Sequence, residues 1–270
     1  MRRSFLLAAL TTAVTACAAP APSEPRVAAP GATTNAPADP EPEATPSAGE
    51  PDAACPPGKA EDEPACVYAA IVKRIPRQLD IERAVEPYAG NVIEVKKAYD
   101  DDFTVIHALS NEFEPLAARP EHHILSIRAR LQQAALHDVL RQRLAGAEPP
   151  RVILYTDKEA ALLEKAATSG NPNLVATSEE IRRRREEMYQ SARETWLQAA
   201  ESALVRHYAD ALLRARAWGL ETAELVRARA RFRHWSELLG DAKMKAFTEG
   251  LVDPANGKPF VYSPGVFDGP

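Results

Sequence analysis

One segment restricts the possible folds of this chain more than any other: a helical pattern that runs uninterrupted from Thr177 to Trp218. No proline or glycine lies inside it, and its apolar residues recur at spacings of three and four, the period of an α-helix. At 1.5 Å per residue the helix would be roughly 60 Å long, which is longer than a compact domain needs. We therefore expect an elongated all-α fold of bundled helices and hairpins.

This long helix is expected to open with a capping box formed by Thr177 and Glu180, and to end at Gly219. Two adjoining apolar stripes on it are expected to face the core. The first consists of Ile181, Met188, Ala192, Trp196, Ala199 and Ala203, and the second of Leu197, Leu204, Tyr208, Leu212 and Ala215.

The same helical spacing extends over residues 64–250, where almost no alternating strand pattern occurs. It predicts a hairpin with its bend near Ala118: one helix of about 25 residues from Val92, and a second that starts at Pro120 and stops at Gly146. The face of the first helix expected to be buried carries Val92, Val95, Tyr99, Phe103, Ile106, Leu109, Phe113 and Leu116.

The segment between this hairpin and the long helix predicts one short helix. Thr156 and Glu159 form a capping-box pattern before Asp157–Ala167, and the string SGNPN at 169–173 then breaks the chain. The string RVILY at 151–155 is the one strand-like run, and it fits a short strand or an extended connector equally well.

A further helix is expected from Thr222 to Leu239, with a stop at Gly240 and a last short helix up to Glu249. Residues 251–270 do not continue the helical pattern and predict an extended C-terminal tail. We interpret this tail as a strap packed on the helices, with a docking peptide as the alternative. Within it, DPANGKPFVY is similar to tails of uncharacterised bacterial envelope proteins and implies no activity.

The N-terminus has the pattern of a signal peptide over residues 1–16. A positive Met1–Arg3 precedes an apolar run of about ten residues, the length of a signal core and not of a membrane span. The following Val14–Cys17 resembles the lipobox of bacterial lipoproteins. This resemblance implies cleavage before Cys17 and acylation of Cys17, whereas the alternative is a structural cysteine in an N-terminal helix.

Resemblance to that family implies where in the cell the protein is located. One acyl chain binds a membrane only marginally, but the several chains of a bacterial lipoprotein hold it essentially permanently. Ala18 and Ala19 follow the cysteine where members retained in the inner membrane often carry Asp, so the resemblance implies the outer membrane. The chain is expected in the cell envelope, attached to the membrane through its N-terminal lipid, on either the periplasmic or the surface side.

Residues 17–63 predict a disordered, acidic tether between this lipid and the helical domain at 64–250. The stretch 18–57 contains eleven prolines and a single large aliphatic residue, Val27, so it cannot bury enough apolar surface to fold. Its net charge of about −5 equals the formal charge of the whole chain. The helical region is consequently close to neutral, which argues against a nucleic-acid partner.

Two cysteines remain beside Cys17, and we expect a disulfide between Cys55 and Cys66. An even pair in an oxidising compartment is typical of a structural bridge. A zinc site would need more ligands at closer spacing, and a redox pair usually has the Cys-x-x-Cys pattern, so both alternatives fit less well.

No motif for catalysis, metal binding or a cofactor is present, so no catalytic residue, metal ligand or cofactor is predicted. His122 and His123 are adjacent and not spaced as a helical zinc pair, and Asp100–Asp102 lacks the alternation of a calcium loop, which favours a solvated face. In EEIRRRREEMYQ at 179–190, arginines and glutamates alternate at pairing distances, which predicts a salt-bridged helix surface.

A second arginine run is less compensated by acidic residues and is the candidate contact for an acidic partner, together with an exposed tryptophan. It consists of Arg227, Arg229, Arg231 and Arg233. The tryptophan is Trp218, which like Trp196 and Trp235 falls on an apolar stripe and is otherwise expected in the core.

The absence of catalytic motifs, the expected lipid anchor and the long helices together favour a non-enzymatic scaffold or adaptor that holds an envelope protein partner. One alternative is an envelope hydrolase whose site forms only in the fold, with His107, His122, His137 or His207 as base. Another is a small-ligand-binding helical lipoprotein. A deep pocket with converging histidines or carboxylates would favour these alternatives, whereas a filled core with an exposed apolar groove would favour the adaptor.

Overall fold

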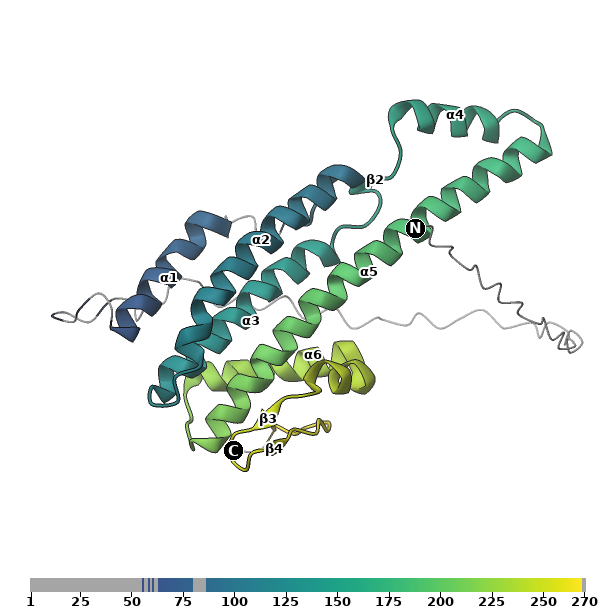
Figure 1. Cartoon of the computed structure of the whole chain (residues 1–270). Coiled ribbons are helices and arrows are strands. Elements are labelled where there is room, and N and C mark those ends of the chain that lie inside the picture. Colours follow the sequence, from purple (N-terminus) through teal and green to yellow (C-terminus); the bar gives the residue numbers. More distant parts are fainter. Residues whose placement is uncertain (1–54, 56–57, 59, 61–62, 80–85, 269–270) are drawn as a thin grey trace, which may run out of the picture. The chain divides into compact units, whose positions relative to one another are not determined.

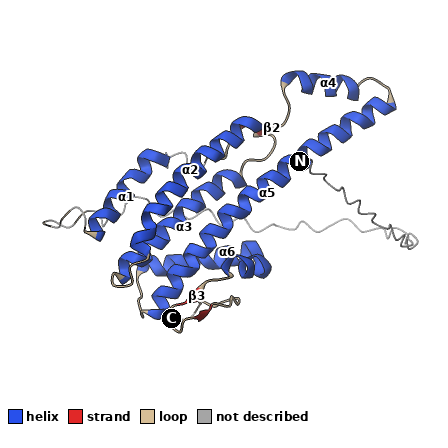
Figure 2. Cartoon of the chain, viewed as in Figure 1, coloured by secondary structure: helices blue, strands red, loops and turns tan. Residues whose placement is uncertain are grey.

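A computed structural model describes residues 55, 58, 60, 63–79 and 86–268 of the chain. These residues form six α-helices and four two-residue strands (Figures 1 and 2), which confirms the predicted all-α fold with one long helix. The helices are α1 Pro64–Leu79, α2 Val92–Ala117, α3 His123–Ala145, α4 Asp157–Ala167, α5 Pro172–Ala217 and α6 Ala223–Thr248. The predicted signal peptide, Cys17 and most of the predicted tether lie outside the described residues.

The four strands form two minimal pairs. β1 (Gly90–Asn91) pairs in parallel with β2 (Val152–Ile153), and β3 (Val252–Asp253) pairs antiparallel with β4 (Lys258–Pro259). The strand-like run at 151–155 thus contains a two-residue strand, which pairs with the residues before α2.

Two apolar clusters hold the helices together. The first is built mainly by α1, α2 and α3, and the second by the C-terminal half of α5, α6 and the tail, with residues of α3 in both. Helix α3 packs along α5 and also against α2. An amphipathic helix gains most of its stability from such packing, so α3 and α5 form the central pair of the fold.

The predicted buried face of α2 is confirmed with one exception. Val95, Ile106 and Phe113 are fully buried, whereas Phe103 is 38% exposed and stacks on His107 of the same helix. A spacing of three and four identifies the apolar stripe but not its edge. Phe103 lies at that edge, beyond the helices that cover α2.

The bend between α2 and α3 is longer than predicted. Pro120 was expected in the first turn of the second helix, but α3 begins only at His123, and residues 118–122 form the turn. The buried Ser126 hydroxyl donates to the Ala117 carbonyl, at 2.6 Å. This bond ties the start of α3 to the end of α2.

Helix α3 ends at Gly146, as predicted, and this glycine has a packing role. Its φ of −86° is open to any residue, but a Cβ there would lie 2.4 Å from Cγ of Pro87. The rigid proline ring cannot rotate away. We expect Gly146→Ala to lower the free energy of unfolding by about 1–3 kcal/mol, because a methyl group must force the two segments apart.

Chemical denaturation of Gly146→Ala beside Gly170→Ala measures this cost. Gly170 has no neighbour within 4 Å of its added Cβ but has a φ of +71°, so its variant reports backbone strain alone. A Gly146→Ala chain as stable as the parent would contradict the contact with Pro87.

The start of α5 differs from the prediction. The helix begins at Pro172, where proline is favoured, and Asn171 caps it by accepting from the backbone N–H of Asn173. The expected capping box at Thr177 is wrong, because the Thr177 hydroxyl donates to the Asn173 carbonyl inside the helix. The break at 169–173 therefore supplies the cap, and α5 has 46 residues.

Helix α6 is interrupted at Gly240, the predicted stop, where φ is 75°. The tail then returns to the helices: Phe260, Tyr262 and Phe267 are buried, and Phe267 packs edge-on against Phe232 of α6 with ring centroids 5.0 Å apart. These contacts favour the strap over the docking peptide.

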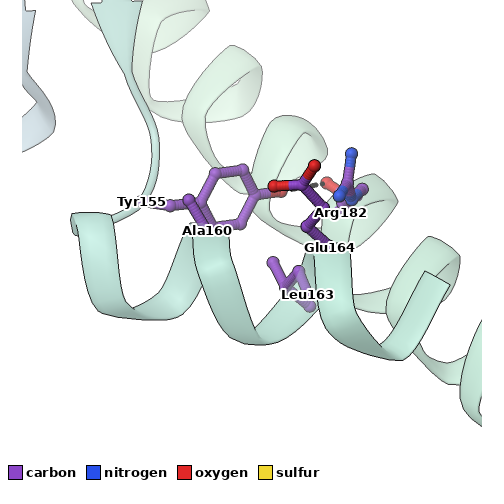
Figure 3. Close-up of a pocket in the computed structure, with 5 residues that line it drawn as sticks. All are labelled: Tyr155, Ala160, Leu163, Glu164 and Arg182. Atoms are coloured by element: carbon purple, nitrogen blue, oxygen red, sulfur yellow. Dashed lines mark hydrogen bonds between the residues drawn. The ribbon is translucent and has the colours of Figure 1, made fainter. Parts of the chain in front are cut away.

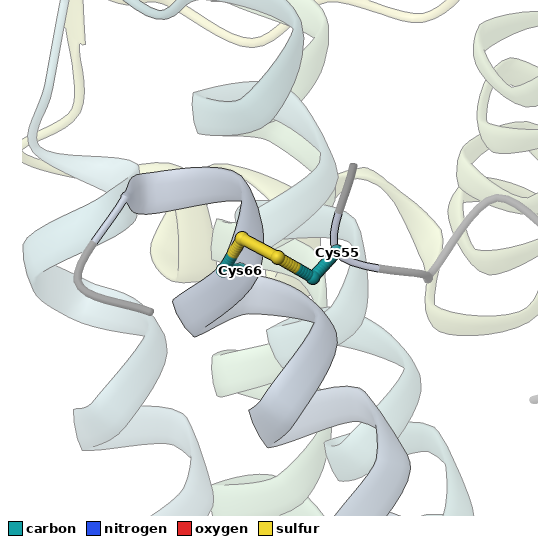
Figure 4. The surroundings of a disulfide bond; sticks show 2 residues. All are labelled: Cys55 and Cys66. Carbon is teal, nitrogen blue, oxygen red and sulfur yellow. A yellow bond between two sulfur atoms is a disulfide. The ribbon is translucent and has the colours of Figure 1, made fainter. Parts of the chain in front are cut away.

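The structure joins Cys55 and Cys66 in the expected disulfide (Figure 4). Cys66 is buried in the first turn of α1, whereas Cys55 is exposed. The bridge therefore attaches the segment before α1 to the N-terminal end of the helical domain.

Candidate functional site

Helix α4 and residues 172–188 of α5 form a two-helix arm, and we use "the arm" for these two segments. Helix α4 packs mainly on α5, and the arm extends beyond the remaining helices (Figure 1). The second half of α5, in contrast, is covered by α3 and α6. Most side chains of the arm are therefore open to other molecules.

Local capping fixes the first helix of the arm. Thr156 accepts from the backbone N–H of Glu159, and the Glu159 carboxylate accepts in turn from the N–H and hydroxyl of Thr156. This is the capping box predicted from the sequence. The bonds from Thr156, followed by that from Arg185, lower the pKa of the Glu159 carboxyl.

Arg185 of α5 links the two helices. Its guanidinium donates to the Leu154 carbonyl at 2.9 Å and to the Glu159 carboxylate at 2.7 Å. It also lies over the ring of Tyr155, 5.6 Å from the centroid. One side chain thus fixes the connector and the start of α4 on α5.

A cavity of about 350 Å³ opens between the two helices of the arm (Figure 3). Tyr155, Ala160 and Leu163 supply its apolar wall, and the Tyr155 hydroxyl donates to the Arg182 carbonyl at 3.2 Å. Glu164 and Arg182 complete the lining. Their carboxylate and guanidinium have no ion-pair partner among the described residues, so charges of both signs flank an apolar surface.

Two of the four histidines proposed as a possible base come together. His137 of α3 and His207 of α5 stack with ring centroids 5.6 Å apart. His107 of α2 is close enough to His137 to lower the pKa of His137. His122, in contrast, is exposed in the turn before α3. Neither of the two cavities described, at the arm and beside the tail, is lined by a histidine.

Burial keeps this histidine pair neutral. It lowers the pKa of His137 to about 4, with a smaller contribution from the electrostatic interaction with His107. It lowers the pKa of His207 to about 3, with contributions from His137 and Arg130. The buried Nδ1 of His137 has no hydrogen-bond partner in the described part of the chain.

The candidate arginines of α6 take part in ion pairs within the chain. Arg229 pairs with Glu221, Arg231 with the buried Asp138, and Arg233 with Asp268 of the tail. Arg227 is exposed. These pairs give three of the arginines a role in holding α6, and a contact with an acidic partner at this run stays a prediction.

Trp218, the tryptophan named with these arginines, is half-buried at the end of α5. Its ring stacks on His123, with centroids 4.2 Å apart. The stack joins the first residue of α3 to the end of α5 and gives His123 a structural role. Of the other tryptophans, Trp235 is 2% exposed and Trp196 stacks on Tyr99.

Of the two charged segments singled out in the sequence, one is an exposed salt-bridged surface and the other is partly buried. In the run 179–190, Arg183 pairs with Glu180 and Glu187, which confirms a salt-bridged surface. The expectation of a solvated face at Asp100–Asp102 is wrong for Asp102. This residue is only partly exposed, because it pairs with Arg143 and accepts from the Tyr88 hydroxyl.

Sequence reasoning missed a polar layer between α2, α3 and α5. Arg130 pairs with Glu114 at 2.5 Å and with Asp210 at 2.6 Å, and the buried Gln133 donates to the Ser110 carbonyl. Arg130 and Gln133 lie three residues apart among apolar positions of α3. That spacing was the available signal that the interface contains paired polar groups.

No group of three His, Cys, Asp or Glu side chains among the described residues is placed to hold a metal ion. None of the helices in the described ranges combines the length and apolar character that a membrane crossing requires.

Comparisons of the chain with protein families, with curated proteins and with solved structures find no match.

Proposed function

We propose that this protein is a lipid-anchored, non-enzymatic adaptor of the cell envelope, which uses the arm to hold a protein partner near the outer membrane. The anchor part of the proposal rests on the lipobox pattern that ends in Cys17. The adaptor part rests on the fold. The membrane contact is the N-terminal lipid, and the partner is another envelope protein.

The observation that carries the adaptor role is the contrast between the arm and the rest of the helical domain. The helical bundle is filled with apolar side chains and, between α2, α3 and α5, with ion-paired polar side chains. At the arm, Tyr155 and Leu163 line an open cavity beside the charges of Glu164 and Arg182, which form no ion pair with any residue that the structure describes. An apolar anchor pocket with polar groups at its rim is the usual anatomy of a protein-binding site.

The alternatives gain less support. A hydrolase would need substrate access to a base, but His137 is 7% exposed and stacks on His207 in the α3–α5 interface. A ligand-binding lipoprotein would need an enclosed cleft, whereas the cavity of the arm is open to solvent.

The test combines photocrosslinking with cell fractionation. A photoreactive amino acid at Glu164 is expected to give one discrete adduct with an envelope protein, while the same group at the exposed Lys97 of α2 gives none. In a Cys17→Ser chain the adduct is expected to leave the membrane fraction, because the anchor is lost. A Cys55→Ser chain keeps Cys17 and is expected to stay with the membrane.

Each half of the proposal has its own contrary result. A Cys17→Ser chain that still sediments with membranes, or a native mature chain that begins elsewhere, contradicts the lipid anchor. Equal crosslinking from Glu164 and Lys97, or none from either, contradicts the adaptor role of the arm.

A further inference from the structure

The arm carries an uncovered apolar stripe on α5. Leu174, Ile181 and Met188 are 47%, 42% and 71% exposed. They are seven residues apart, so they lie on one face of the helix, as the positions of a coiled-coil seam do. At 1.5 Å per residue the stripe extends over about 21 Å.

This stripe lies on a different side of the arm from the cavity. Arg182 and Ala160 line the cavity, whereas Ile181 points about 100° away from Arg182 around the helix. On α4, Leu162 is 68% exposed and follows Glu159, the partner of Arg185, by three residues. Leu162 therefore shares the side of the stripe.

The stripe corrects the expectation that Ile181 and Met188 face a core. Within the arm, all of whose residues are described, only Leu163 and Ser178 are buried. Two helices alone cannot cover their own apolar faces, and helical hairpins commonly gain a second layer by pairing with another hairpin. The exposed row is a surface that lacks such a layer.

The charges beside the stripe show which occupant fits. Glu180 and Arg184 lie next to it on the side away from α4, and they pair with each other within the helix. Two identical surfaces form an interface only if they are self-complementary. In a parallel pair of α5 helices the two Arg184 side chains, one turn after Ile181, would face each other across the contact, so like charges would meet.

An antiparallel pair with its twofold axis near Arg182 brings opposite charges together instead. Glu180 of each copy becomes level with Arg184 of the other copy, which makes two reciprocal ion pairs possible. In the same alignment Leu174 is offset by two residues, about 3 Å along the helix, from Met188 of the second copy, and the two Ile181 side chains are offset by the same amount, so both apolar pairs can still touch. One arrangement therefore covers the apolar stripe and also pairs its neighbouring charges.

We propose that this face of the arm, formed by Leu162, Leu174, Ile181 and Met188, joins two copies of the chain through an antiparallel contact of their α5 helices. The proposal goes beyond the adaptor role and does not depend on the lipid anchor, because every residue in it belongs to the helical domain. It leaves the cavity on a different side of each arm open, so the dimer would present two partner sites.

The first test places a single cysteine at the expected axis of the full chain. Ile181→Cys, treated with copper–phenanthroline as oxidant, is expected to form a disulfide-linked homodimer on a non-reducing gel. Arg183→Cys is the matched control, since it is exposed on the same helix but directed away from the stripe. The parent chain, without the added cysteine, gives the background from native thiols.

Charge variants in the Ile181→Cys chain separate a second copy from other occupants. Glu180→Arg and Arg184→Glu chains are each expected to crosslink to themselves about tenfold less, because like charges meet at both ends of the contact. Mixed together, the two variant chains restore opposite charges at both pairs. The mixture is therefore expected to recover the crosslinked dimer.

Several results would overturn the proposal. Equal crosslinking from Ile181→Cys and Arg183→Cys, no dimer above the parent background, or no recovery in the mixture contradicts an antiparallel self-contact. An adduct whose mass shows a different protein assigns the stripe to another occupant. None of these results bears on crosslinking from Glu164, which tests the adaptor role separately.

Discussion

Replacing Phe113 with alanine is expected to lower the free energy of unfolding by about 3–5 kcal/mol, the largest effect of any single substitution considered. Phe113 has no exposed surface and lies in the first apolar cluster, where its ring is 5.7 Å from that of Tyr68 of α1. Alanine would leave a cavity between α1 and α2 that close-packed neighbours can fill only in part.

Phe103→Ala on the same helix is the matched control, since it removes the same atoms from a side chain that is 38% exposed. We expect it to cost about 1 kcal/mol or less, because surface substitutions seldom cost more. Urea denaturation followed by far-UV circular dichroism measures both values. Equal costs for the two variants would contradict the packing of α1 on α2.

Acidification from pH 7 to pH 4 is expected to destabilise the chain through the buried histidine pair. In the unfolded chain His137 and His207 take up protons near pH 6.5, whereas in the folded chain they do so only near pH 4 and pH 3. The unfolded state therefore binds more protons as the pH falls below 6.5. The stability contributed by the neutral pair is complete above pH 6.5 and decreases progressively below it, by on the order of 3 kcal/mol for His137 at pH 4.

The charged groups around the pair do not offset this loss. Arg130 is positive and its charge further lowers the pKa of His207, while the carboxylate of Glu114 acts in the opposite sense with a smaller effect. Glu114 is itself hydrogen-bonded by Arg130, which lowers its pKa, so it stays ionised over most of this range.

The measurement is the free energy of unfolding at several pH values in the parent, His137→Gln, His207→Gln and His122→Gln chains. Comparing each chain with itself at pH 7 removes any general cost of the substitution. A flatter pH dependence is expected for the two buried positions and an unchanged one for the exposed His122. The opposite pattern, or parallel curves for all four chains, would show that the pair is not the source of the acid sensitivity.

Part of the candidate site could be predicted. The capping box at Thr156 and Glu159 fixed the start of α4, because a cap depends on residues only three positions apart. The run at 179–190 was correctly interpreted as a paired surface for the same reason. The cavity between α4 and α5 was not predicted, since Tyr155 and Arg182 meet only after the chain reverses at 169–173.

The corrected details share one physical origin. Ile181, Met188 and Phe103 follow the apolar period of their helices but stay exposed, because none of the other described helices covers them. Periodicity shows which side chains share a face, and packing alone shows whether that face is covered. The histidine pair is similar, because His137 and His207 come from helices joined only by tertiary contacts.

The sequence by itself determined the helical class, the long helix, the breaks at Gly146 and Gly240 and the pairing of Cys55 with Cys66, because each depends on local spacing, backbone preference or a small number of possible partners. Only the tertiary structure decided which half of α5 is buried, which charges are paired and where the arm leaves an apolar stripe uncovered. Those features depend on contacts between segments far apart in the chain, and no local pattern specifies them.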